Sequence, residues 1–212
     1  IASEMFASKR RPLPALTVVQ VGALPVRGAQ VLIESVAEDP KRLHNPDGLA
    51  FISGQVAMVN RPYEPIRPFA EKSLMDLAAA FEAAGVTPDN ALRITCLTSP
   101  SDGIDYLRER LFRDYRSAAI AVVQQAREPT RTMVSCEAVA RLGKPPEGGI
   151  AYVKPGESGF SQVALVNTRE LVLTGSQLAF GTREEDARLA FQRLGRALEQ
   201  AGTSYRHIVF AG

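Results

Sequence analysis

The feature that most limits how this chain can fold is an internal repeat. The segment FQRLGRALEQAG, residues 191–202, repeats the segment LMDLAAAFEAAG, residues 74–85, at a constant offset of 117 positions (191 − 74 and 202 − 85). The segment LVLTGSQLAF, residues 171–180, echoes LAFISGQVAM, residues 49–58. Because helix, glycine and strand signals recur in one order, the sequence predicts a chain built from copies of one unit.

The start of the chain matches the other half of that unit. The segments LTVVQVGALP, residues 16–25, and VLIESVA, residues 31–37, echo the strand pair that ends in VSCEAVA, residues 134–140. The start of the chain thus resembles only the second half of a unit, and its end only the first half. The chain is therefore expected to begin and end inside a repeat.

We expect three segments. A complete unit spans 42–143, the second half of a unit spans 1–40, and the first half of a unit spans 150–212, after the linker 144–149. A lone half-unit cannot bury its helix face, so either the two halves complete each other or each has lost its complement. In the first case, residues 18–22 would pair with residues 171–178.

The complete unit shows alternating strand and helix signals. Apolar residues at Leu74, Leu77, Phe81 and Ala84 have helical spacing, and Gly85 ends that helix. The expected order is strand, helix, strand, helix, strand, strand, at residues 48–58, 69–84, 92–97, 101–112, 118–123 and 132–139.

Composition limits the classes of protein to which this chain can belong. Of 212 residues, 45% are hydrophobic and the formal net charge is +2, which suits globular domains and gives no basic tract for nucleic acid. No apolar run reaches the roughly 18 residues that span a bilayer, and no signal peptide is visible. We therefore expect a cytoplasmic protein with no nucleic-acid or membrane partner.

The two cysteines, Cys96 and Cys136, lie in apolar, strand-like segments. Two buried thiols in a reducing compartment are expected in preference to a disulfide or a reactive site. The two histidines, His44 and His207, belong to no zinc or nucleophile motif, and they are expected in a loop and a strand respectively. The sequence predicts no metal and no cofactor.

Five segments of the complete unit carry a resemblance to the Rid (YjgF-like, endoribonuclease L-PSP) family of enamine and imine deaminases. They are FISGQ (51–55), AAFEAAG (79–85), RITCLTS (93–99), YRSAAIAVV (115–123) and CEAVA (136–140). The resemblance covers about 100 residues. It implies an α+β, chorismate-mutase-like fold, repeated along the chain, in which each unit is a mixed sheet with two helices on one face.

The resemblance also implies a reaction, namely hydrolytic deamination of small 2-imino and 2-enamino acids such as 2-aminoacrylate. Arg116 would hold the substrate carboxylate through its planar guanidinium, and Glu137 would order the attacking water. Ser53, Gly54 and Ser117 would line a small cleft that a neighbouring unit closes. Family members form trimers, so a homo-oligomer with trimer or pseudo-trimer symmetry is expected.

Departures from the family pattern leave other functions open. The usual catalytic glutamate position is Ser135, and in the first segment the arginine and glutamate positions are Leu16 and Leu32. If the chain is not an enzyme, Arg116 is a surface cation. Glu137, like its counterpart Glu34, is then a structural residue. The alternative is a catalytically degenerate protein that binds carboxylates or serves as a scaffold.

Three further possibilities concern the same fold. Arg131, which opens the last strand, could replace or assist Arg116. Another acid-processing enzyme, such as a chorismate hydrolase, is a second possibility, because a fold does not fix its chemistry. Ribonuclease activity ranks last, because the chain has no Trp and a near-neutral charge.

Overall fold

The computed structural model describes residues 46–59, 64–125, 131–153, 161–175, 177 and 183–210. The chain divides into two compact units, a larger one of residues 20–168 with 209–212 and a smaller one of residues 1–19 with 169–208. The expectations for residues 1–40, including Leu16, Leu32, Glu34 and the pairing of 18–22 with 171–178, lie outside the described residues, as does His44.

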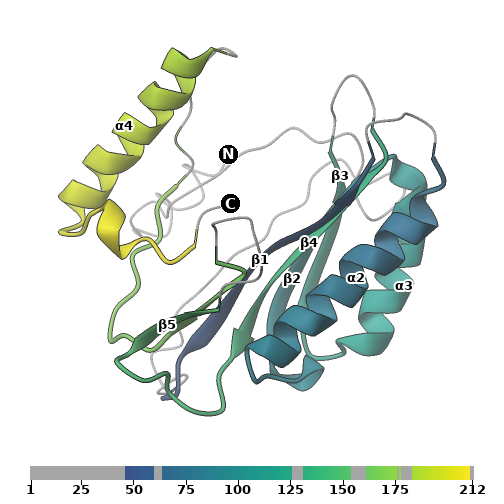
Figure 1. Cartoon of the computed structure of the whole chain (residues 1–212), viewed down its shortest axis with the longest axis horizontal. Coiled ribbons are helices and arrows are strands. Elements are labelled where there is room, and N and C mark those ends of the chain that lie inside the picture. The colour runs from purple at the N-terminus through teal and green to yellow at the C-terminus, as the bar shows by residue number, and fades with distance from the viewer. Residues whose placement is uncertain are drawn as a thin grey trace, which may run out of the picture. The chain divides into compact units, whose positions relative to one another are not determined.

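A mixed sheet with the strand order β3-β2-β4-β1-β6-β5 forms the larger unit. Strands β2 and β3 are parallel, and the other neighbouring pairs are antiparallel. Helices α2 and α3 lie on one face of this sheet (Figure 1). This confirms the expected α+β unit. The bounds are β1 Leu49–Met58, α2 Ile66–Ala83, β2 Ala91–Ser99, α3 Ile104–Asp114, β3 Ala119–Gln124, β4 Met133–Arg141, β5 Ile150–Val153 and β6 Val163–Val166.

Helix α2 begins at Ile66, one turn earlier than the apolar pattern predicts. Pro68 falls within its first turn, where a backbone N–H has no partner inside the helix and the missing donor costs nothing. The sequence places the start too late because Pro68 reads as a loop signal.

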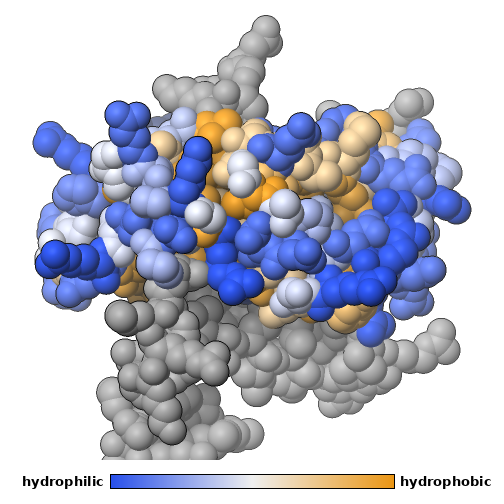
Figure 2. Space-filling view, turned by 90° about the horizontal axis from the view of Figure 1, so that it is seen from below, coloured by the Kyte–Doolittle hydropathy of each residue, from blue (hydrophilic) through white to orange (hydrophobic). Residues whose placement is uncertain are grey.

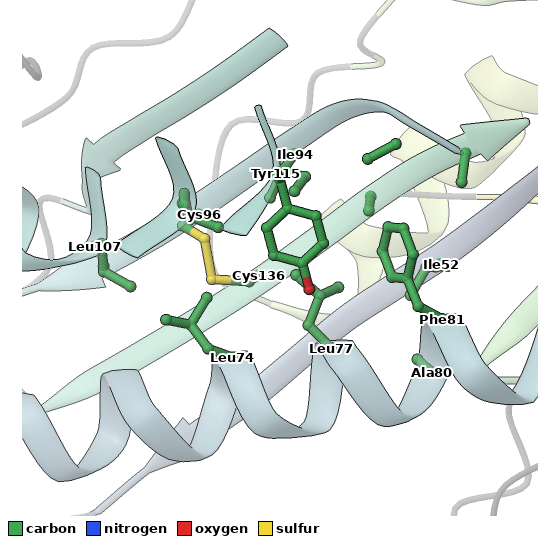
Figure 3. Close-up of a cluster of buried hydrophobic side chains, with 14 of the residues drawn as sticks. Ile52, Leu74, Leu77, Ala80, Phe81, Ile94, Cys96, Leu107, Tyr115 and Cys136 are labelled. Carbon is green, nitrogen blue, oxygen red and sulfur yellow. A yellow bond between two sulfur atoms is a disulfide. The ribbon is translucent and has the colours of Figure 1, made fainter. Parts of the chain in front are cut away.

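The core lies between the helices and the sheet. Leu74, Leu77 and Phe81 point from α2 toward the sheet, where they meet side chains such as Ile52 and Ile94 (Figure 3). All five are buried, and each large apolar side chain removed from water contributes about 2 kcal/mol. This burial holds α2 against β1 and β4, the two strands that carry the candidate site.

Large apolar side chains also reach the surface. Figure 2 shows one face of the chain on which apolar residues gather between charged and polar ones. On β1, Val56 and Met58 are 51% and 47% exposed, while Ala57 between them is buried. Because side chains alternate along a strand, Val56 and Met58 lie on the sheet face away from the helices.

None of the helices in the described ranges is long and apolar enough to cross a membrane. The cytoplasmic location stays a prediction.

The helix-end repeat is visible in the backbone. Helix α4 (Glu184–Gln200) ends 117 residues after α2 (200 − 83), and Gly85 and Gly202 follow with φ of 68° and 77°. Positive φ suits glycine, which has no Cβ to clash. A 3-10 turn follows each glycine, at Pro88–Asn90 and Tyr205–His207. The local repeat therefore extends from helix to turn, whereas a repeat of the whole unit stays a prediction.

Beyond this helix end, the smaller unit differs from expectation. Residues 171–175 form no strand, and His207, which the sequence predicts in a strand, is the last residue of the 3-10 turn Tyr205–His207. Leu198 is buried as its counterpart Phe81 is, but Leu194 is half-buried and Phe191 is 63% exposed. The repeat predicts that Phe191, Leu194 and Leu198 pack against a sheet as Leu74, Leu77 and Phe81 do, and this prediction is wrong for Phe191. The described part of this unit contains no strand for the helix to cover.

The chain after the linker joins the larger unit. Strand β6 pairs antiparallel with the first half of β1, from Leu49↔Val166 to Ile52↔Val163, and β5 pairs with β6 at the sheet edge. The loop 144–149 thus connects β4 to a hairpin of the same sheet. The division into three Rid-like segments stays a prediction.

The cysteines form a disulfide, so the expectation of two separate thiols is wrong. Cys96 of β2 and Cys136 of β4 are register partners, with Cα atoms 4.1 Å apart, and both are fully buried beneath α2 and α3 (Figure 3). Forty residues separate them in the sequence, and only strand pairing brings them together.

We expect reduction of this disulfide to lower stability. A cross-link that closes a loop of this length limits the unfolded chain, and its loss should cost about 2–4 kcal/mol. Urea unfolding with and without reductant measures the change, and the Cys96→Ala, Cys136→Ala double variant provides a reductant-insensitive control. Two titratable thiols in the denatured, unreduced protein would contradict the bridge.

Candidate active site

A β-bulge in β1 forms the centre of the candidate site. Ile52 pairs with Ala138 and Gln55 with Cys136, so Ser53 and Gly54 together oppose the single residue Glu137. Ser53 and Gly54 are two of the residues that the Rid resemblance places at the substrate cleft. Since Glu137 is flanked by the buried residues Cys136 and Ala138, its half-buried side chain lies on the sheet face away from the helices.

Gly54 leaves room for a neighbour on β4. A Cβ atom at position 54 would lie 2.6 Å from Oγ of Ser135, closer than side chains pack. Ser135 stands where the Rid pattern has its catalytic glutamate, two residues from Glu137 on the same face. The structure therefore brings together four of the residues that the sequence points to: Ser53, Gly54, Ser135 and Glu137.

Hydrogen bonds fix the bulge from one side. The backbone N–H and the Oγ of Ser53 both donate to the carbonyl oxygen of Gln162, at 3.0 and 3.1 Å. Nε2 of Gln162 donates to Oε1 of Gln55 at 2.7 Å, and Nε2 of Gln55 donates to the carbonyl oxygen of Ser53 at 2.7 Å. Sequence reasoning missed Gln162, because it is 109 residues from Ser53 in the chain.

The other side of the bulge is tied to helix α2. Oγ of the fully buried Ser73 donates to the carbonyl oxygen of Gln55 at 2.6 Å. A serine on the buried face of a helix gives no functional signal in the sequence, yet it satisfies a carbonyl that the strand irregularity leaves available.

Arg116 lies at another place on the unit. It follows Tyr115, the residue after α3, in a turn closed by a hydrogen bond from the N–H of Ala118 to the carbonyl oxygen of Tyr115 at 3.2 Å. Tyr115 is buried against Phe81, and burial, with a smaller effect of Asp114, raises its pKa. Arg116 and Ser117 are exposed on this anchored turn.

The sheet order separates Arg116 from the bulge. Strands β2 and β4 lie between β3, which follows Arg116, and β1, so three inter-strand spacings of about 4.8 Å amount to roughly 14 Å. The cleft expected beside Arg116, with Ser53 and Gly54 in its wall, therefore requires a neighbouring unit. Arg131, which precedes β4, is also exposed.

The described residues contain no group of three or more His, Cys, Asp or Glu side chains that could hold a metal ion.

Several solved structures are similar to part of this chain. A candidate endoribonuclease from Thermotoga maritima has 26% identity and a TM-score of 0.36, over 45% of this chain and 80% of its own. A Rid-family protein of unknown function, YyfB from Yersinia pestis, has 20% identity and a TM-score of 0.37, over 45% and 79%. E. coli TdcF with bound serine has 21% identity and a TM-score of 0.37, over 45% and 82%.

Another similar structure is a member of the yjgF family from Streptococcus pyogenes, at 13% identity and a TM-score of 0.36, over 50% of this chain and 92% of its own. No family model matches the chain, and no curated protein matches it. Membership as a tandem-repeat protein stays a prediction.

The contact between Gly54 and Ser135 gives a test of the bulge. Gly54→Ala should lower stability by about 1–3 kcal/mol, because the added Cβ meets Oγ of Ser135. Ser135→Gly should restore part of the loss in the double variant. Gly143→Ala is the matched control, since a Cβ there meets no atom within 4 Å. Equal losses in Gly54→Ala and Gly143→Ala, measured by urea unfolding, would show that the close approach is absent.

Proposed function

We propose that the larger unit catalyses hydrolytic deamination of small 2-imino or 2-enamino acids. The observation that carries the proposal is the placement of Glu137 opposite the Ser53–Gly54 bulge. The sequence resemblance to the Rid family supplies the reaction class. A carboxylate facing an irregular strand in which a glycine leaves space beside it suits a site that positions a water molecule against a small substrate.

In the proposed reaction, water adds to the imine carbon, and loss of ammonia from the resulting carbinolamine leaves the keto acid. Glu137 accepts a proton from the water, and the bulge holds the reacting group near it. Arg116 binds the substrate carboxylate through two parallel hydrogen bonds. Neither a metal nor a cofactor has a part in this scheme.

The proposed site includes a second unit. Strand β3, which follows Arg116, lies three strand spacings or roughly 14 Å from β1, so the arginine that serves one bulge comes from a neighbouring unit or copy. The exposed Val56 and Met58 on the sheet face away from the helices favour association through that face. We therefore propose a homo-oligomer with trimer or pseudo-trimer symmetry.

A second candidate function has its own support. Ser135 provides no carboxylate at the position where the family pattern has one, and Arg116 is exposed on a turn. A protein that binds a small carboxylate without turning it over, or that serves as a scaffold, fits these two observations. Ribonuclease and chorismate hydrolase activity have no comparable support in the described residues.

Three variants test the enzyme. With freshly generated 2-aminoacrylate, Arg116→Ala should abolish hydrolysis, and Glu137→Gln should lower kcat about a hundredfold or more if Glu137 activates the water. Ser135→Glu should raise kcat, because it restores a carboxylate on the site face beside Gly54. Release of ammonia and keto acid is the measurement.

The control variants separate the loss or gain of a charge or of side-chain size from an effect on the reaction itself. Arg113→Ala removes another exposed arginine, which pairs with Asp114 and lies in the last turn of α3, and it should leave the rate unchanged. Ser135→Gln matches the size of Glu without its charge. Wild-type protein and Ser135→Glu that both react no faster than buffer would remove the enzyme proposal. Retained binding of a carboxylate that Arg116→Ala abolishes would then favour the binding protein.

A further inference from the structure

The bulge is held by a residue that lies beyond the linker. Gln162 directly precedes β6, and Ser53 and Gln55 belong to β1. Its carbonyl oxygen accepts from the N–H and the Oγ of Ser53, and its side chain donates to Oε1 of Gln55.

These bonds form a closed chain of amides. Nε2 of Gln162 donates to Gln55, Nε2 of Gln55 donates to the carbonyl oxygen of Ser53, and Ser53 donates to the carbonyl oxygen of Gln162. The Gln55 side chain is buried, so a lost partner there leaves a polar group without compensation from water. This closed set of hydrogen bonds therefore fixes one conformation of the bulge.

The position of Gln162 follows from the pairing of β6. Because Ile52 pairs with Val163, the next position along each strand places Gln162 beside Ser53. The hairpin thus extends the sheet along the first half of β1 and stops where the bulge begins. The bulge therefore lies where the pairing of β1 with β6 ends and where its pairing with β4 is interrupted before it resumes at Gln55.

We propose that Gln162 is a positioning residue, which acts through Gln55 and Ser53 to hold the bulge opposite Glu137. The inference deepens the proposed function and rests on it for its catalytic consequence. It means that the site depends on chain on both sides of the 144–149 linker, because residues 42–143 by themselves lack the hydrogen bonds that Gln162 makes to the bulge.

The test uses the full chain with Gln162→Ala and Gln162→Glu. The second variant keeps the length of the side chain, but a carboxylate cannot donate to Oε1 of Gln55. Both variants remove the bond to Oε1 of Gln55, which leaves the Gln55 side chain less firmly held. Its carboxamide protons, which donate to the carbonyl oxygen of Ser53, should then exchange faster in NMR spectra. The N–H of Ser53 keeps its bond to the backbone carbonyl oxygen of residue 162, but it should exchange about tenfold faster, because the network around it has lost the one hydrogen bond from the Gln162 side chain. The kcat should fall at least fivefold, with KM changed less than twofold.

Asn167→Ala is the matched control. Asn167 follows the same hairpin strand and donates to the carbonyl oxygen of Pro46 at 3.1 Å, away from the bulge. It should lower stability by a similar amount while the Gln55 signals and kcat stay unchanged. If Gln162→Ala and Asn167→Ala changed the Gln55 signals and kcat to the same extent, the cause would be a general loosening of the hairpin. This result would overturn the positioning role.

The outcomes separate the two proposals. If the wild-type chain does not hydrolyse 2-aminoacrylate, the proposed function fails, and the Gln55 and Ser53 signals still decide whether Gln162 holds the bulge. If the wild type is active and Gln162→Glu keeps both its Gln55 signals and its kcat, the positioning role is wrong while the function stands.

Discussion

The register of strand β4 is the constraint on which the rest of the larger unit depends. β4 pairs with β2 on one side and β1 on the other, and its residues alternate between the helix-covered face and the open face. A slip of one residue would turn Cys136 and Ala138 out of the core and Glu137 into it. The core, the disulfide and the candidate site therefore share one cause, because α2 and α3 cover only one face of β4.

The bulge in β1 forms the candidate site within this otherwise regular sheet. Opposite a straight strand, Glu137 would face one ordinary pair partner, whereas the bulge sets Ser53 and Gly54 against it and leaves space beside Ser135. Hydrogen bonds that Ser53 donates to Gln162 on one side, and that Ser73 donates to the carbonyl oxygen of Gln55 on the other, hold that irregularity. The functional proposal and the positioning role of Gln162 both follow from this local departure from strand pairing.

The smaller unit shows that similar sequence does not ensure similar packing. Helix α4 ends as α2 does, through Gly202 and a 3-10 turn, because these signals act within a few residues. Phe191 nevertheless remains exposed, although its counterpart Leu74 is buried against the sheet. Burial requires a sheet surface, and residues 171–175, where the repeat predicts a strand, form none.

The sequence by itself determined the order of elements in the complete unit, the helix faces of Leu74, Leu77 and Phe81, and the glycine stops, because periodicity and positive φ are local properties. It also pointed to Ser53, Gly54 and Glu137. Only the tertiary structure decided that Cys96 meets Cys136, that Gln162 reaches the bulge, and that Arg116 lies strands away from it. These depend on strand order and register, which join residues some 40 to 109 positions apart through pairings that no local pattern encodes.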